Sequence, residues 1–312
     1  MKTISFITLI FISINCTSQN TVKNISNIAK NIDTTEVRAF ESAIERVYGK
    51  DYGDSINDYY SIEKNGYLIT QKTIGIYNEK WSENTKYTLT ISKYDTIYFE
   101  KVINNLEPVT LTPDSRNIEV EIYNDIAYIL YINGNGEKNI KQRMYLSVVN
   151  LKSGKTIKNK LLYEQQYGIS NLRISLNSTF EKLLIAYTDI SKPNSENLIY
   201  SVYDLRKFEF SIKPESIVLF DKWEKVNPTF VKCNSEIYLF NETGKEYGAF
   251  GVTGEPAMAF SIINKENRPE NYKVIKENGQ IFYQYIYDNY LYYKLQVKSD
   301  KIELKKIELK KL

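Results

Sequence analysis

Histidine is absent from this sequence, so carboxylates are the side chains best suited to acid–base chemistry. Four Asp residues lie near the ends of expected strands: Asp54, Asp58, Asp125 and Asp189. A glycosidase or lyase needs two carboxyl groups at a defined separation, and nothing in the sequence pairs these four. The lack of His also excludes Ser-His-Asp and Cys-His arrangements and every His-ligated metal site. We therefore predict no catalytic residue, no metal ligand and no cofactor.

The densest glycine segment is "YGAFGVTGEP", residues 247–256. Gly248, Gly251 and Gly254 fall close together there, which indicates unusual backbone angles or a close approach by another group. The segment follows an expected strand, and loops on a rigid scaffold commonly bind ligands. These three glycines are the predicted binding residues, and a plain connection between strands is the alternative.

Other residues that could contact a ligand have simpler explanations. Trp81 and Trp223 could stack on sugar rings, but packing in the core or at a blade edge is the favoured explanation. Cys233 is expected to be a small core residue. The loop 133–137, "NGNGE", has neither the phosphate-loop pattern nor the Asp spacing of a calcium loop, so a hairpin connection is predicted.

The N-terminus predicts export. A basic start is followed by an apolar run over residues 3–14, which suits a signal-peptide core and is shorter than the roughly 20 residues of a spanning helix. The run leads to "SINC", residues 13–16, which resembles a bacterial lipoprotein box and implies a lipid on Cys16. Ser13 and Asn15 depart from that pattern, so cleavage after Ser18 remains an alternative. We expect a signal peptide over 1–18, a tether over 19–32 and one domain over 33–312. The protein would then be lipid-anchored in the bacterial cell envelope (outer membrane or periplasm) or secreted.

Charge and composition restrict the partners. The chain has 312 residues, 41 of them basic and 38 acidic, and a net charge of +3. These charges are spread along the chain, whereas nucleic-acid-binding proteins concentrate basic residues on one surface. A local lysine excess occurs only over 301–312, where we predict a charged edge strand that resists pairing with other chains. Nucleic acid is therefore excluded as a partner, and contact with the membrane is expected only through an N-terminal lipid.

One short helix is predicted before the main domain. "DTTE", residues 33–36, has the spacing of a capping box. Val37, Phe40, Ile44 and Val47 follow at helical intervals. These signals favour an amphipathic helix over about 34–47, and no comparable helical stretch follows residue 48.

From about residue 65 the chain repeats a hairpin pattern. In each repeat an apolar strand is followed by a polar loop, a second strand and a turn rich in Asp, Asn, Gly and Lys. The expected first strands are 66–71, 125–132, 182–187, 236–240 and 280–287, and their partners are 87–92, 144–151, 198–205, 257–263 and 291–297. Proline falls between these strands, as ladder hydrogen bonding requires.

Both faces of these hairpins are apolar. In "QIFYQYIYDNYLYYKLQV", residues 280–297, Ile281 and Tyr283 share one face while Phe282 and Ile286 share the other. An antiparallel hairpin usually turns one face to water. Because helices to cover the second face are missing, each hairpin must pack between two others, as in a β-propeller. We predict an all-β propeller of about five to six antiparallel blades, with a pair of sandwiches or a solenoid as the alternatives.

Two segments resemble a known family. "SVVNLKSGKTI" (147–157) and "IYSVYDLRKFEF" (199–210) resemble the hairpins of TolB-like and related propeller lipoproteins of Bacteroidota. The resemblance implies architecture and carries no functional residues with it. The function expected is that of a non-catalytic binding or scaffold protein whose partner is an envelope protein or a glycan. The alternatives are a carbohydrate-active propeller enzyme with paired carboxylates and a purely structural lipoprotein.

Overall fold

The computed structural model describes part of the chain. Its described residues are 23–24, 30–31, 50–54, 57–74, 86–93, 96–104, 118–133, 141–165, 168–192, 195–217, 225–233, 235–244, 246–248, 251–253, 257–277, 279–287, 289–298 and 301–309. The predicted signal peptide and the predicted helix over 34–47 lie outside these residues. Within the described ranges, no helix has the length and apolarity needed to cross a bilayer.

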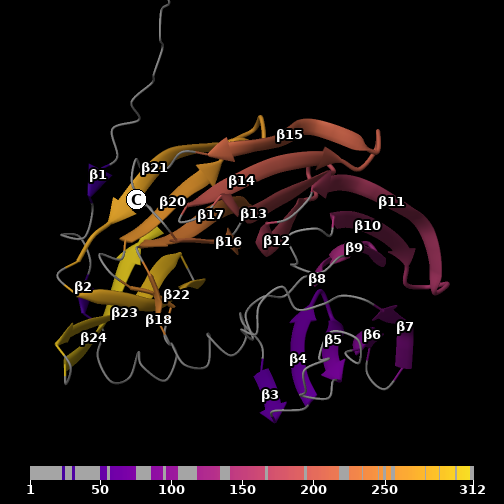
Figure 1. Cartoon of the computed structure of the whole chain (residues 1–312), viewed down its shortest axis with the longest axis horizontal. Helices are drawn as coiled ribbons and strands as arrows, with labels where there is room; N and C mark the ends of the chain where they lie inside the picture. Colours follow the sequence, from indigo (N-terminus) through magenta and orange to yellow (C-terminus); the bar gives the residue numbers. More distant parts are fainter. Residues whose placement is uncertain are drawn as a thin grey trace, which may run out of the picture.

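The described chain forms a β-propeller of five sheets that follow one another along the sequence (Figure 1). Blade 1 contains β3 (Lys50–Asp54), β4 (Asn57–Lys64), β5 (Tyr67–Ile74), β6 (Lys86–Lys93) and β7 (Thr96–Asn104). Blade 2 contains β8 (Ile118–Tyr123), β9 (Ile126–Asn133), β10 (Gln142–Asn150) and β11 (Lys155–Gln165). Blade 3 contains β12 (Ile169–Asn177), β13 (Lys182–Lys192), β14 (Ser195–Asp204) and β15 (Glu209–Ile217).

The last two blades combine distant parts of the chain. Blade 4 contains β16 (Lys225–Cys233), β17 (Glu236–Gly244), β20 (Ala257–Ile263), β21 (Pro269–Ile275) and, at its edge, β1 (Lys23–Asn24). Blade 5 contains β22 (Gln280–Tyr287), β23 (Tyr290–Lys298), β24 (Lys301–Glu308) and, as its fourth strand, β2 (Lys30–Asn31). A separate hairpin, β18 (Glu246–Gly248) and β19 (Gly251–Thr253), lies between β17 and β20 in sequence.

The first strand of each later blade lies nearest the axis of the ring. Strand β8 contacts β12, β12 contacts β16, and β16 contacts β22. The remaining strands of each blade follow outward in order, so β11 and β15 are outer strands. We call β8, β12, β16 and β22 the inner strands.

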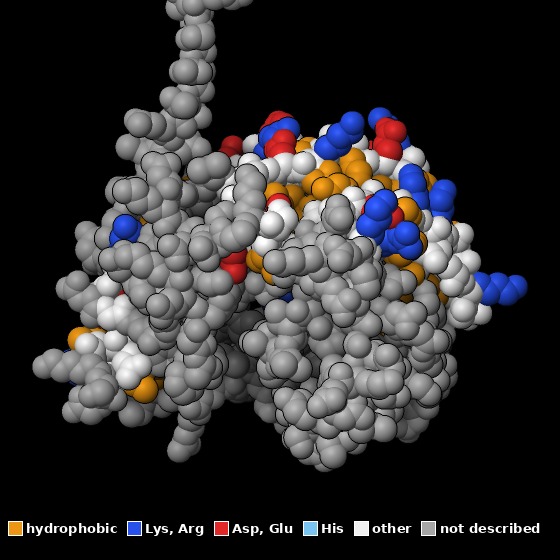
Figure 2. Space-filling view, in the orientation of Figure 1, with side chains coloured by type: hydrophobic (Ala, Val, Ile, Leu, Met, Phe, Trp, Pro, Cys, Tyr) orange, Lys and Arg blue, Asp and Glu red, His pale blue; other side chains and the backbone are white. Residues whose placement is uncertain are grey.

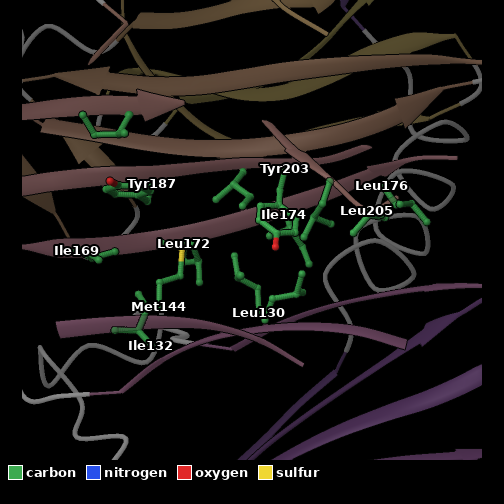
Figure 3. Close-up of a cluster of buried hydrophobic side chains, with 14 of the residues drawn as sticks. Leu130, Ile132, Met144, Ile169, Leu172, Ile174, Leu176, Tyr187, Tyr203 and Leu205 are labelled. Carbon is green, nitrogen blue, oxygen red and sulfur yellow. The ribbon is translucent and has the colours of Figure 1, made fainter. Parts of the chain in front are cut away.

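Alternate residues of a strand pack against different blades, which explains the two apolar faces. On β9, Ala127 and Ile129 belong to the core between blades 1 and 2. Leu130 and Ile132 of the same strand belong to the core between blades 2 and 3, where they meet Leu172 and its neighbours (Figure 3). Since each fully buried large side chain contributes roughly 1.5–3 kcal/mol, these interfaces hold the ring together.

The hairpin over 280–297 also packs its described face against a neighbouring blade. Ile281, Leu291, Tyr293 and Leu295 pack against blade 4. A register shift between Phe282 and Tyr285 interrupts the simple alternation that the sequence suggests. The side chains of the three β22 tyrosines, Tyr283, Tyr285 and Tyr287, are not described.

Part of the segment predicted as a tether pairs with the ring. Strand β1 joins the outer edge of β21 in parallel, and β2 joins the outer edge of β24. The lysine-rich tail forms β24, as an outer strand with β23 on one side and the two residues of β2 on the other. The N-terminal segment therefore completes the last blade, which the C-terminal part of the chain alone leaves with three strands.

Candidate functional site

Inner strand β8 alternates apolar and acidic residues. Ile118, Val120 and Ile122 are buried in the core between blades 1 and 2. Glu119 and Glu121 lie between them in sequence and therefore project from the opposite side of the strand. This alternation places two carboxylates together on the inner strand of blade 2.

Glu121 is buried and binds two lysines from other blades. Its Oε1 accepts a hydrogen bond from Lys64 Nζ at 3.3 Å, and its Oε2 accepts one from Lys232 Nζ at 2.9 Å. Burial of the carboxyl group raises its pKa, but the charges and hydrogen bonds of the two lysines together lower it more. The pKa of Glu121 therefore lies below its usual value, and the group is ionised at neutral pH.

The contact between Lys232 and Glu121 joins blades that are not neighbours. Lys232 lies near the end of β16 in blade 4, Glu121 lies on β8 in blade 2, and blade 3 stands between them in the ring. An ion pair between the inner strands of blades 2 and 4 must pass across the centre of the ring. Lys64, at the end of β4, extends the same network to blade 1.

The second carboxylate of β8 is also paired. Arg173 Nη1, on inner strand β12, lies 3.5 Å from Glu119 Oε1 and also donates to the carbonyl oxygen of Leu172 at 2.8 Å. We call Lys64, Glu119, Glu121, Arg173 and Lys232 the central ion-pair cluster. Among its side chains Lys232 is the most accessible, at 44% exposed, and Glu121 the least, at 10%.

Side chains of blade 1 hold β8 in place by donating hydrogen bonds to the carbonyl groups along the edge of β8 that no strand pairs. Gln71 Nε2 donates to the carbonyl oxygen of Ile118 at 3.1 Å, and Lys64 Nζ donates to that of Val120 at 2.8 Å. Asn65 Nδ2 donates to the carbonyl oxygen of Ile122. These bonds satisfy edge groups that would otherwise invite pairing with another chain. They also fix the position of Glu121 relative to Lys64.

The described contacts of Asp125 and Asp189 join neither residue to another of the four predicted aspartates. Asp125 accepts a hydrogen bond from Tyr67 Oη at 2.5 Å and pairs with Lys152 at 2.9 Å. The Tyr67 hydrogen bond is the main cause of the lowered pKa of Asp125, and the Lys152 contacts add to it. Asp189 accepts a bond from its near neighbour Ser191, as a local turn does. Asp54 and Asp58 lie in the β3–β4 hairpin, and their side chains are not described.

Glu119 and Glu121 are the carboxylates that sequence reasoning missed. The signal that could have found them is "IEVEIY", residues 118–123, in which acidic residues alternate with branched apolar ones. That pattern indicates a strand with one face in the core and one acidic face. The cations that face it come from distant segments, so they carry no local signal.

The predicted glycine site lies at the other end of blade 4. Gly248 pairs with Gly251 in the β18–β19 hairpin, and Gly254 lies outside the described residues. Strand β17 returns antiparallel to β16, so this hairpin follows the end of the blade opposite to Lys232. Strand β19 contacts β17 and inner strand β22. The hairpin and the Lys232 end of the central ion-pair cluster therefore mark opposite ends of the ring.

The tryptophans, the loop over 133–137 and Cys233 add no described contact to the candidate site. Trp81, Trp223 and residues 134–140 are outside the described ranges. Cys233 is the last residue of β16 and pairs with Glu236 across the turn. No group of three or more His, Cys, Asp and Glu side chains that could hold a metal ion occurs in the part of the chain that the structure describes.

Comparisons with known proteins find structural likeness only. No family model matches the chain, and no curated protein matches it in sequence. A solved structure of unknown function from Dyadobacter fermentans is similar at 12% identity and a TM-score of 0.48, covering 80% of this chain and 77% of its own. The RS223 β-xylosidase is similar at 11% identity and a TM-score of 0.42, covering 83% and 94%. A GH43 endo-arabinanase from Bacillus licheniformis is similar at 12% identity and a TM-score of 0.41, covering 82% and 95%.

Proposed function

We propose that this protein is an exported, lipid-anchored and non-catalytic β-propeller that binds or scaffolds partners in the bacterial cell envelope. We relate it to the TolB-like propellers because its hairpins over residues 147–157 and 199–210 resemble theirs. Its partner is an envelope protein or a glycan. The observation that carries the proposal is that Glu119 and Glu121, the two carboxylates of inner strand β8, are both ion-paired to basic side chains of other blades.

Ion pairing of this kind opposes acid catalysis. A general acid must hold its proton near the working pH, which requires a raised pKa. The two lysines lower the pKa of Glu121 and occupy both of its oxygens. A carboxylate in that state stabilises the ring and cannot protonate a leaving group.

The same strand is also the reason to keep an enzyme as the second candidate. Residues two apart on a strand project from the same face with Cα atoms about 6.5–7 Å apart, and a glycosidase needs two carboxyl groups about 5–10 Å apart. Glu119 and Glu121 have this spacing. A carbohydrate-active enzyme would need a ligand that displaces the lysines and arginine and so releases one carboxylate to take up a proton.

The role that remains is binding of a partner by loops at one end of the ring. The β18–β19 hairpin stands at the end of the ring opposite to Lys232 and contacts an inner strand. Loops in this position on a rigid scaffold are suited to recognition. We assign Gly248 and Gly251 to this recognition surface, together with Gly254.

The test uses the chain from Thr17 as bait in native envelope extract, with a Gly251→Val variant as the matched control. A valine side chain in the hairpin should abolish capture of the partner while leaving the unfolding temperature close to that of the wild type. A partner retained equally by both baits would contradict recognition by this hairpin.

The catalytic alternative is tested on the same protein. The wild type should hydrolyse chromogenic glycosides no faster than the Glu119→Gln and Glu121→Gln variants do. Turnover that both substitutions abolish would replace the binding proposal with the enzyme.

Anchoring is tested separately by metabolic labelling with a fatty-acid analogue. Wild type should be labelled and Cys16→Ala should not. Unlabelled wild type would discard the lipid and leave cleavage after Ser18 as the export route.

A further inference from the structure

One buried amide in the interface between blades 3 and 4 lacks the partners that its chemistry requires. Asn241, toward the end of β17, is 1% exposed. Its side chain carries an acceptor, Oδ1, and a donor group, Nδ2, and neither atom has a hydrogen-bond partner among the described residues. Folded proteins rarely keep a buried amide unpaired, because it has lost its bonds to bulk water. This amide therefore indicates a further polar ligand at the site.

The register of β17 gives the direction of the Asn241 side chain. Ile237 and Leu239 of the same strand pack between blades 3 and 4, against Leu184 and Ala186 of β13. Alternate residues of a strand project from the same face, so Asn241 projects into this interface as well. Its amide lies in an apolar contact between two blades, away from the surface of the ring.

Other polar groups between these blades bind each other directly. Thr188 Oγ1 of β13 donates to the carbonyl oxygen of Val226 on β16 at 2.8 Å. At the surface, basic and acidic side chains lie side by side over β14 and β15, and Arg268 of blade 4 pairs there with Glu215 at 2.6 Å (Figure 2). The two blades therefore match these polar groups with protein partners, which the Asn241 amide does not have among the described residues.

The strands beside β17 place little bulk next to this amide. Asn241 pairs with Pro228 of β16 on one side and with Ala259 of β20 on the other. Both are short side chains, whereas Leu239, the next residue on the same face, pairs with Phe230. A water molecule is the smallest polar ligand and suits a buried polar position between short side chains.

A second buried polar group lies close to the first. Ser261 of β20 is 1% exposed and follows Ala259 by two residues, so its hydroxyl projects from the same face as the Asn241 amide. Such diagonal neighbours have Cα atoms about 7–8 Å apart, a span that a bridging water covers. Tyr272 of β21 is a polar neighbour of the Ser261 hydroxyl, and a hydroxyl binds more than one partner. Both buried groups can therefore share one water.

We infer that Asn241 and Ser261 hold one buried water molecule between blades 3 and 4. The water donates to Asn241 Oδ1, accepts from Nδ2 and binds Ser261 Oγ, which gives it about three hydrogen bonds, as is typical of an internal water. It links β17 to β20, the two strands that precede and follow the β18–β19 hairpin. The site is independent of the function proposed for that hairpin.

The first test counts long-lived water molecules by magnetic relaxation dispersion of water nuclei, on the chain from Thr17. Asn241→Leu keeps the approximate size of the side chain and removes its polar atoms, so it should lose one long-lived water. Ser261→Ala should lose the same molecule. The double variant should also lose one water, because both side chains bind the same molecule. A loss of two waters in the double variant would contradict a shared site.

Asn159→Leu is the matched control. Asn159 lies exposed on β11, and its Oδ1 already accepts a hydrogen bond from Ser147 Oγ at 3.1 Å. The same substitution there should leave the number of long-lived waters unchanged. Equal losses in Asn159→Leu and Asn241→Leu would show that the effect does not come from the Asn241 site.

The second test uses the wild type, so it decides the question even if Asn241→Leu does not fold. A high-resolution crystal structure of the chain from Thr17 should show one ordered water within hydrogen-bond distance of both the Asn241 amide and Ser261 Oγ. An amide bonded to protein groups instead, or an unchanged water count in folded Asn241→Leu, would overturn the inference.

Discussion

Lys232 Nζ lies 2.9 Å from Glu121 Oε2, although the two residues are 111 positions apart and belong to blades that do not touch as neighbours. This ion pair crosses the centre of the ring and, with Lys64, links blades 1, 2 and 4. Ion pairs therefore link the blades at the centre of the ring. Apolar packing links neighbouring blades along their facing sides.

Removing the charge of Glu121 should destabilise the ring. Glu121→Gln keeps the shape of the side chain but leaves Lys64 and Lys232 without their counterion. Breaking a buried pair costs about 3–5 kcal/mol, and the partial exposure of Lys232 places our expectation near the lower end. Urea unfolding measures the loss. Glu164→Gln is the control, because Glu164 pairs with Lys141 and Arg143 on the exposed side of blade 2, and its loss should cost much less stability than the loss of Glu121.

The contribution of Glu121 should depend on pH in one direction. The folded pKa of this carboxyl lies below 4.5, its usual value in the unfolded chain. Its stabilising effect is therefore complete well above 4.5 and is lost as the pH falls through the lower folded pKa. The difference in unfolding free energy between wild type and Glu121→Gln should be constant from about pH 7 to pH 6 and should shrink as the pH drops below about 4. A difference that grows on acidification would contradict this assignment.

The propeller packing predicts a large cost for truncating a side chain between blades. Leu130 is fully buried in the core between blades 2 and 3. Leu130→Ala should lose about 2–5 kcal/mol of unfolding free energy, through lost transfer energy and a residual cavity. Leu161→Ala, on outer strand β11, removes a side chain of the same kind from a residue that is 43% exposed, so its cost should stay below about 1 kcal/mol. Equal losses in the two variants would be inconsistent with an interface at Leu130.

The pairing of β2 with β24 predicts a stabilising substitution. Lys306→Glu places a carboxylate opposite Lys30 and should raise the unfolding free energy by about 0.2–1 kcal/mol. The gain should vanish in a Lys30→Gln background, because the interaction needs both partners. Thermal unfolding of the four proteins of this double-mutant cycle gives the coupling, and a coupling of zero would show that the two residues do not meet.

The sequence alone determined the architecture. Apolar residues at strand spacing on both faces of successive hairpins, without helices to cover them, predicted stacked blades, and the cores on either side of β9 confirm this. Such a prediction succeeds because alternation along a strand is a local property, and each hairpin carries it within its own consecutive residues.

Tertiary structure alone decided the site. Glu121 acquires its role from Lys64 and Lys232, which are 57 and 111 residues away, and only the closing of the ring places them together. The pairing of β2 with β24 is equally distant in sequence, since two lysine-containing segments at opposite ends of the chain share one blade. Charges at long range leave no periodic pattern along a chain, so the sequence shows which residues are charged while the fold selects which of them meet.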